Sequence, residues 1–214
     1  MIALVFHKLS QQLKKVEPMF GGLVACCLLI PSYSIAAPLG LPQNTGKIGC
    51  SIGTSNVSLD DPSGATTDEW AAQPLNLIYT DWLFRDIRQW TELYYYKTSL
   101  DADDSNIGQN IKRFGLRFSL QKTYRLTQTW SPWFGAGVDL SNNKYSTRHT
   151  KDSDGFLIEA FDDRDETSLS LLLNVLSEWS LQKDWTVGAK LEQSIPVDGD
   201  ITEFTAAVTI LYRY

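Results

Sequence analysis

The chain contains few of the residues that build disulfides or soft-metal sites. It has 3 cysteines and 2 histidines among 214 residues. Cys26 and Cys27 lie in a segment that we interpret below as a leader, which leaves Cys50 as the one cysteine of the mature chain. A single thiol cannot form an internal disulfide, and no second soft ligand is near it in the sequence. The composition therefore excludes a disulfide framework and a zinc site of the cysteine–histidine type.

Positive charge is also scarce. The formal net charge is −6, with 19 basic and 25 acidic residues. An acidic protein repels the phosphates of nucleic acids, which disfavours nucleic acid as a partner. The sequence also lacks a glycine-rich phosphate loop and an internal repeat of about 20 to 50 residues. These absences argue against a phosphate-loop nucleotide site and against a repeat protein.

Long apolar runs are lacking too, apart from one near the N-terminus. Residues 19–30 form this run, three lysines precede it and Pro31 ends it. A membrane-spanning helix needs about 20 apolar residues, so the run is too short to be one. A basic start, a short apolar run and the small residues of Ser34-Ile-Ala36 are typical of a secretory signal peptide. We therefore expect residues 1–36 to be a signal peptide and residues 37–214 to form the mature domain.

The mature chain would carry 16 basic and 24 acidic residues, a net charge of −8, once the three lysines and one glutamate of the leader are removed. No apolar stretch in it is long enough for a transmembrane helix. In lipid, only helices and closed barrels satisfy all of their backbone hydrogen bonds. A secreted chain of this kind is therefore either a soluble periplasmic protein or a β-barrel.

Alternation of apolar and polar residues decides between these two classes. It is clearest in the last eleven residues, where a period of two predicts a strand that runs to the final residue. The apolar face of this strand holds Phe204, Ala206, Val208, Ile210, Tyr212 and Tyr214. The same alternation recurs upstream, and there the polar face carries charges and glycines while the apolar face has almost none. This pattern favours lipid outside and a packed polar interior.

The alternation predicts eight strands, which is the smallest usual number for an outer-membrane barrel. Their expected ranges are about 47–58, 74–83, 88–99, 110–121, 130–142, 167–180, 185–195 and 201–214. The predicted fold is therefore all-β, an eight-stranded antiparallel up-and-down transmembrane β-barrel.

The connections between these strands differ in kind. Those after the first, third, fifth and seventh strands are acidic and mostly longer, and the longest covers residues 143–166. Those after the fourth and sixth strands, residues 122–127 and 182–184, are short. Long outer loops and short periplasmic turns are typical of outer-membrane barrels, which predicts that both termini lie in the periplasm.

Aromatic residues support the same orientation. Six of the seven tryptophans lie near the expected periplasmic turns, and aromatic rings prefer the membrane–water interface. We therefore expect a periplasmic aromatic girdle formed by Trp82, Trp90, Trp130, Trp133, Trp179 and Trp185.

Charges of both signs fall on the inward face of the expected barrel. They are Glu92, Arg113, Arg117, Asp139, Lys190, Glu192 and Glu203. Because a buried charge without a partner costs several kcal/mol, we expect these side chains to pair and to close the interior. If the turn between the fourth and fifth strands centres on residue 126, Arg113 and Asp139 face each other directly.

In its strand pattern, loop asymmetry and terminal aromatic residue, the segment 47–214 resembles small eight-stranded outer-membrane barrels of the OmpA/OmpX/OmpW type. The resemblance implies residence in the outer membrane of a Gram-negative cell, with outer-membrane lipids, lipopolysaccharide and the barrel-assembly machinery as partners. It implies a structural or surface-interaction role without catalysis or a cofactor. It also implies that the last strand carries the assembly signal, for which the candidates are Phe204, Ile210, Tyr212 and Tyr214.

Two other functions stay open at this stage. One is a porin-like outer-membrane channel for small or apolar solutes. The other is a lipid A-modifying enzyme that uses His149, which has Ser146 near it in the sequence and Asp152 and Asp154 as groups that could orient a base. The paired serine and histidine pattern of the known lipid A-modifying barrels is not matched here.

The acidic outer loops suggest divalent cations as a further partner. Asp101-Ala-Asp-Asp104 and Asp152-Ser-Asp154 present carboxylates that suit Ca²⁺. Neither segment has the complete spacing of a calcium-binding loop, so solvated acidic loops are the favoured interpretation.

The terminal aromatic residue leads to the first testable prediction. Deleting Tyr214, or changing it to aspartate, should lower the yield of folded barrel because the apolar face of the last strand loses its final residue. Heat-modifiable mobility on gels and the protein level in the membrane fraction measure this yield. Tyr214→Phe, which keeps the aromatic ring, should behave as wild type, and an unchanged yield for Tyr214→Asp would contradict the assembly signal.

Overall fold

The computed structural model describes residues 46–60, 66–84, 86–102, 106–127 and 130–214. The expected signal peptide and its cleavage site lie outside these residues. Within them, the secondary structure consists of nine strands. They are β1 Lys47–Asp60, β2 Thr66–Phe84, β3 Ile87–Leu100, β4 Gly108–Thr123, β5 Trp133–Lys151, β6 Leu157–Phe161, β7 Arg164–Ser180, β8 Trp185–Asp198 and β9 Ile201–Arg213.

No helix among the described residues is long and apolar enough to cross a membrane.

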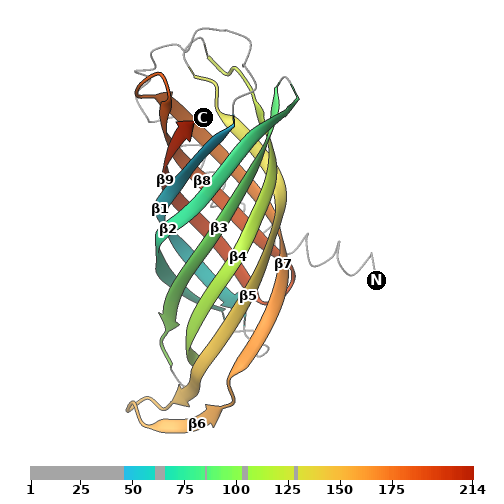
Figure 1. Ribbon diagram of the computed structural model, residues 1–214. Coiled ribbons are helices and arrows are strands. Elements are labelled where there is room, and N and C mark those ends of the chain that lie inside the picture. Colours follow the sequence, from blue (N-terminus) through green and yellow to red (C-terminus); the bar gives the residue numbers. More distant parts are fainter. Residues whose placement is uncertain (1–45, 61–65, 85, 103–105, 128–129) are drawn as a thin grey trace.

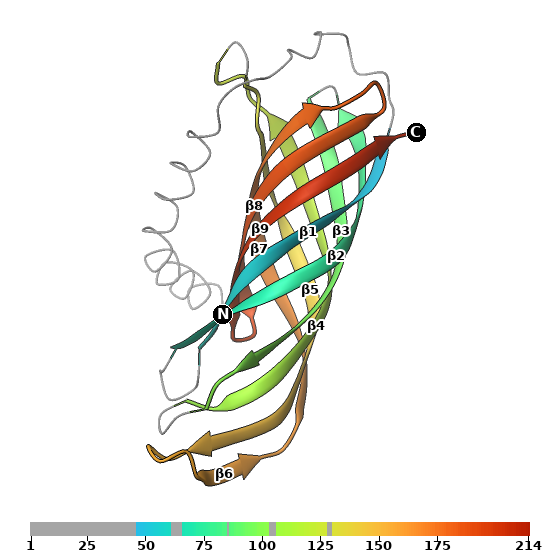
Figure 2. The same ribbon diagram turned by 90° about the vertical axis from the view of Figure 1, so that its left-hand side faces the viewer.

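Eight of the nine strands form a closed antiparallel barrel. The strand order is β4-β3-β2-β1-β9-β8-β7-β5, and the pairing of β4 with β5 closes the ring. The last strand pairs with the first from Lys47 opposite Arg213 to Leu59 opposite Ile201. β6 pairs with β5 alone and lies beyond the barrel wall, at the end away from the C-terminus (Figures 1 and 2). We call this end the β6 end. The opposite end, which holds the C-terminus and the described residues of the connections between β2 and β3, β4 and β5, and β7 and β8, we call the turn end.

The expected fold class is confirmed, and most strand ranges agree within a few residues. β2 is the main exception among the early strands, since it begins at Thr66 and includes Pro74. The register between β1 and β2 shifts between Ser51 and Gly53, opposite this proline. A bulge is one of the few places where a sheet tolerates proline, which cannot donate a ladder hydrogen bond.

The expectation of a long loop over residues 143–166 is wrong. β5 continues to Lys151, its residues up to Tyr145 pair with β7, and residues 148–151 pair with β6. The direction of β5 changes at Thr147, which has a positive φ of 57° and lies in an irregularity of the β4–β5 register. Residues 146–151 at the end of β5 are polar on both faces, so they lack the alternation that marks the membrane strands. Backbone pairing rather than apolar burial makes them part of a strand.

Inside the barrel, apolar side chains form two separate clusters. The cluster toward the β6 end contains Val57, Ala71, Tyr94, Tyr96, Leu100, Ile111, Tyr145 and Ile201. The cluster toward the turn end contains Ile78, Trp90, Trp133, Leu176 and Leu211, with Trp82 packed against it. Charged side chains fill the barrel between them. On the outside, the apolar residues of each strand are exposed, as on β4, where Phe114, Leu116, Phe118 and Leu120 are 38–51% exposed.

Candidate functional site

The most unusual feature of the interior is a central network of charged side chains. Its members are the seven residues that the alternation placed on the inward face, namely Glu92, Arg113, Arg117, Asp139, Lys190, Glu192 and Glu203, and each is at most 1% exposed. They come from five different strands, β3, β4, β5, β8 and β9. At this degree of burial, solvent does not reach these side chains along the bore.

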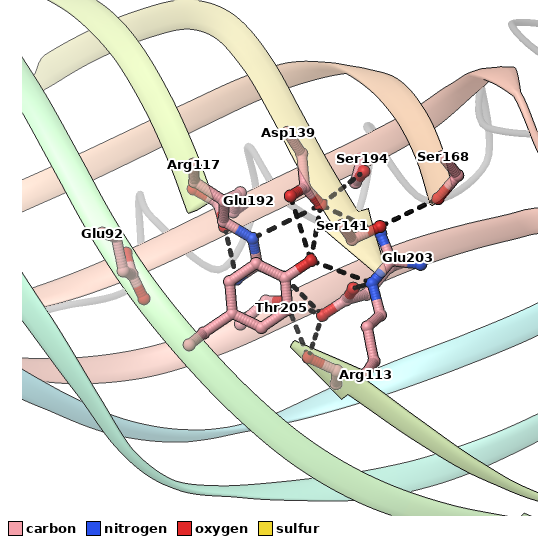
Figure 3. A network of polar contacts seen from close by, with 12 residues as sticks. Glu92, Arg113, Arg117, Asp139, Ser141, Ser168, Glu192, Ser194, Glu203 and Thr205 are labelled. Atoms are coloured by element: carbon pink, nitrogen blue, oxygen red, sulfur yellow. Dashed lines mark hydrogen bonds and ion pairs between the residues drawn. The ribbon is translucent and has the colours of Figure 1, made fainter. Parts of the chain in front are cut away.

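Two arginines of β4 hold the network together (Figure 3). Nη2 of Arg113 lies 2.9 Å from Oδ2 of Asp139, and its Nε lies 3.5 Å from Oε2 of Glu203. Nη2 of Arg117 lies 2.7 Å from Oε1 of Glu203, and its Nη1 lies 2.9 Å from Oε1 of Glu192. The planar guanidinium can contact two carboxylates at once, which suits this bridging position.

A lysine extends the network toward the turn end. Nζ of Lys190 pairs with Glu92 and lies 3.3 Å from Oε1 of Glu192. The network therefore links three cations to four carboxylates in one connected group. Buried carboxylates at this density need further donors, because desolvating a charge costs several kcal/mol.

Uncharged side chains supply these donors. Glu203 accepts hydrogen bonds from Ser55, Gln73, Tyr96 and Thr205. The hydroxyl of Tyr94 lies 2.9 Å from Oδ2 of Asp139. Glu92 accepts from Ser51, Asn76 and the indole of Trp90. Our sequence reasoning placed Trp90 in the girdle and did not name the other residues as partners of the network. The inward positions of Gln73 and Asn76 are three residues apart because the register of β1 and β2 shifts between them.

The register of the network differs from the expected one. Asp139 lies directly opposite Arg117, and Arg113 lies opposite Asn143. The turn between β4 and β5 is centred two residues later than expected, because backbone hydrogen bonds from Tyr124 to Pro132 and from Leu126 to Trp130 extend the hairpin. Arg113 still reaches Asp139, since a long arginine side chain spans the diagonal between positions four residues apart.

A second ionic group closes the turn end. Oε1 of Glu178 lies 2.8 Å from Nη1 of Arg88, and its Oε2 lies 3.1 Å from Nζ of Lys47. The guanidinium of Arg88 stacks over the ring of Trp133 at 3.9 Å from the ring centroid. Sequence reasoning missed this group. The alternation did indicate an inward position for Arg88, because it shares a strand face with Glu92.

The prediction of a periplasmic aromatic girdle is wrong for some of its tryptophans. Trp90 and Trp133 are 0% and 8% exposed and lie inside the barrel, in the apolar cluster of the turn end. Trp82 packs against this cluster, with its ring centroid 5.3 Å from that of Trp133. The reason is the alternation itself, because residues an even number of positions apart on a strand share a face. Trp90 therefore points inward with Glu92, and Trp133 points inward with Asp139.

The other three tryptophans are at the turn end and outside the bore. Trp185 is 44% exposed and packs against Tyr212, with ring centroids 5.1 Å apart and ring planes tilted by 55°. Nε1 of Trp130 donates to Oγ of Ser177, which is on the outward face of β7. Trp179 shares that face and is half-buried. The turn end thus has aromatic residues on both sides of its wall.

Three of the four assembly-signal candidates lie on the outward face of β9, and Tyr214 directly follows this strand. Phe204 is half-buried, and Ile210, Tyr212 and Tyr214 are 45%, 40% and 57% exposed. The backbone N–H of Tyr214 donates to the carbonyl of Gly46, next to β1. The terminal residue is therefore placed at the seam between the first and last strands.

His149 is not arranged for catalysis with its proposed partners. It lies in the part of β5 beyond the wall, and its Nδ1 is 2.8 Å from the carbonyl oxygen of Thr147. Oδ1 of Asp152 accepts the backbone N–H groups of Asp154 and Phe156, so this carboxylate shapes the turn into β6. The geometry therefore gives no support to a serine–histidine–aspartate arrangement.

The acidic loops provide no cation site in the part of the chain that can be described. No three histidine, cysteine, aspartate or glutamate side chains in that part are grouped to hold a metal ion. Asp103 and Asp104 lie outside the described residues. Beyond the barrel wall, β6 and the ends of β5 and β7 next to it form a projection that we call the β6 extension. At its base, Arg164 pairs with Glu166 and lies 3.1 Å from Asp200. Desolvation acts to lower the pKa of Arg164, but its hydrogen bonds and pairing with these two acids raise the pKa above its ordinary value.

The tip of the β6 extension is apolar, which sequence reasoning missed. Phe156, Leu157 and Ile158 are 71%, 64% and 59% exposed. They follow the turn at Asp152–Gly155, where Gly155 has a positive φ of 84°. The signal was three consecutive apolar residues within a charged segment, which is too short to indicate a strand by itself.

Together, the closed antiparallel ring, the polar interior and the apolar outer wall define the fold of a small transmembrane β-barrel. Solved structures agree. Outer membrane protein OprG of Pseudomonas aeruginosa aligns with a TM-score of 0.54 and 14% identity, over 81% of this chain and 98% of OprG. Outer membrane protein AlkL, solved in lipid bilayers, gives 0.52 and 12% over 86% and 97%. Neisserial surface protein A gives 0.51 and 10% over 79% and 97%.

No protein-family model and no curated protein sequence matches the chain. At these low identities the structural likeness establishes the fold, which is that of a small eight-stranded outer-membrane β-barrel.

The central network leads to a prediction on stability. Asp139→Ala should destabilise the barrel by about 3 kcal/mol, because it leaves Arg113 and Arg117 with fewer partners in a dry interior. Arg113→Ala on top of it should cost less than the sum of the two single changes, with a coupling of at least about 1 kcal/mol. Urea unfolding in detergent micelles, followed by tryptophan fluorescence, measures both.

The exposed pair of Lys122 and Asp86, 3.2 Å apart, is the matched control. Its single and double alanine variants should show no measurable coupling, since both side chains are screened by water. Additive effects for Asp139 and Arg113 would mean that the buried pair is not a unit.

Proposed function

We propose that this protein is an integral outer-membrane barrel that makes contacts at the cell surface through its β6 extension. In this proposal residues 37–214 span the membrane after removal of the leader, the β6 end faces outward and the turn end faces the periplasm. The short connections and the C-terminus at the turn end support this orientation. The outer membrane is supported by the fold that the chain shares with OprG and AlkL.

The observation that carries the proposal is the extension itself. β5 and β7 continue past the apolar wall, and β6 ends the strand order, so that one edge of β6 pairs with no other strand among the described residues. Exposed apolar residues and an open strand edge are features that proteins normally avoid unless they serve an interaction. A partner could bury the apolar tip and could pair with the strand edge.

The interior supports a role without transport. Two apolar clusters and the central network place fully buried side chains along the bore, and an eight-stranded barrel is just wide enough for side chains to fill. The arrangement of His149 likewise favours a protein without catalysis over a lipid A-modifying enzyme.

The surface role predicts a specific loss of adhesion. Leu157→Ser together with Ile158→Ser should reduce the retention of expressing cells on protein-coated surfaces severalfold, because the tip loses its apolar contact area. Leu126→Ser with Leu181→Ser is the matched control, since these turn-end leucines are 54% and 64% exposed. The control should adhere as wild type, and equal adhesion of all three strains would reject the tip as the contact site.

The closed interior predicts the absence of a steady pore. The purified barrel should show little steady conductance in planar bilayers in which a general porin, run in parallel, conducts. A stable ohmic channel of porin size would reject the filled interior and make solute transport the leading function.

A further inference from the structure

Three lysines form a row across the outer wall of the barrel near the β6 end. Lys97 of β3 lies directly opposite Lys112 of β4, and Lys112 lies directly opposite Lys144 of β5. All three side chains are on the exposed face of their strands. Directly opposite residues on neighbouring strands have Cβ atoms about 5 Å apart, so the three ammonium groups can converge on one ligand.

The row has little internal compensation for its charge. Like charges placed directly opposite each other destabilise a sheet. Lys144 lies 3.8 Å from Asp165, but both side chains are more than half exposed. Lys97 has a distant contact with the ring of Tyr95, 5.9 Å from the centroid. In the part of the chain that can be described, no carboxylate forms an ion pair with Lys97 or Lys112. An anion would offset this repulsion.

A groove lies beside Lys97 and Lys112 of the row, and Lys144 is not part of its lining. It has a volume of about 470 Å³, and its lining comprises Lys97, Thr98, Ser99, Asn110, Ile111, Lys112 and Ser146. Hydroxyl and amide groups next to the ammonium groups can donate further hydrogen bonds to an anionic oxygen. The groove therefore offers donors and positive charge in the same place.

The position of the row along the barrel axis indicates which kind of anion can reach it. On the outward face of β4, Phe114, Leu116, Phe118 and Leu120 separate Lys112 from Lys122, which is ten residue steps away. At about 3.3 Å per step and a tilt near 40°, the two lysines are about 25 Å apart along the barrel axis. This is the height of the apolar band of an outer-membrane barrel. Lys112 thus marks the edge of the band nearer the β6 end, where lipid headgroups lie.

We propose that Lys97, Lys112 and Lys144 bind the phosphate of an outer-leaflet lipid headgroup. The inference rests on the membrane orientation proposed above. Ammonium groups bind phosphate oxygens through charge-assisted hydrogen bonds, and these are strengthened next to the apolar band, where water is scarcer. The bound headgroup would hold a lipid against the outer wall formed by β3, β4 and β5. This place lies on the membrane side of the extension formed by β5, β6 and β7.

Native mass spectrometry of the purified barrel in detergent tests this assignment, with diphosphorylated lipid A as the probe. The variant K97Q/K112Q/K144Q should bind the probe on the order of 100-fold more weakly than wild type, about fivefold per lysine. The control variant K122Q/K151Q/K183Q removes the same charge elsewhere and should bind as wild type. Lipid A from which the phosphates have been removed should bind wild type and both variants equally weakly.

Equal affinity of wild type and K97Q/K112Q/K144Q for diphosphorylated lipid A would overturn the proposal. Displacement of the lipid by stoichiometric inorganic phosphate would also overturn it, because the row would then be a site for the free anion. Heat-modifiable mobility shows whether each variant is folded. Protease digestion of the β6 extension on intact cells tests the membrane orientation separately, so a failure there is distinguishable from a failure of the lysine row.

Discussion

The pairing of buried charges inside the barrel is the constraint on which the rest of the structure depends. Arg113 and Arg117 each bridge two carboxylates, and neither arginine has access to water. An interior of this kind is stable only if every strand keeps its register, because a shift of one residue would exchange inward and outward side chains. The network thus couples β3, β4, β5, β8 and β9, which are distant in the sequence, into one closed ring.

A filled interior moves the function to the outer surfaces of the molecule. The apolar clusters at both ends shield the network, and the ionic group around Arg88 and Glu178 closes the turn end. What remains available to other molecules is the lipid-facing wall and the extension of β5, β6 and β7. These two surfaces carry different chemistry, since the extension ends in an apolar tip and the wall carries a lysine row at its edge.

Much of this architecture could be predicted from the alternation of residues, and the failures have physical causes. The seven interior charges followed from their parity, because a charge cannot face lipid without a large cost. Trp90 and Trp133 were assigned to the lipid interface from a preference of the residue type, although their parity placed them inside. The extension was missed because the end of β5 is polar on both faces and the five residues of β6 are exposed without a period of two, so their pairing leaves no alternation in the sequence.

The sequence by itself determined the strand count, the two faces of each strand and the closed class of barrel, because a period of two separates lipid from interior locally. Tertiary structure alone decided which charges meet, since Asp139 lies opposite Arg117 and reaches Arg113 only across the diagonal. It also decided that three lysines, 15 and 32 residues apart in the chain, stand side by side. Such neighbours depend on the register between strands, and hairpin geometry and the closure of the ring set that register.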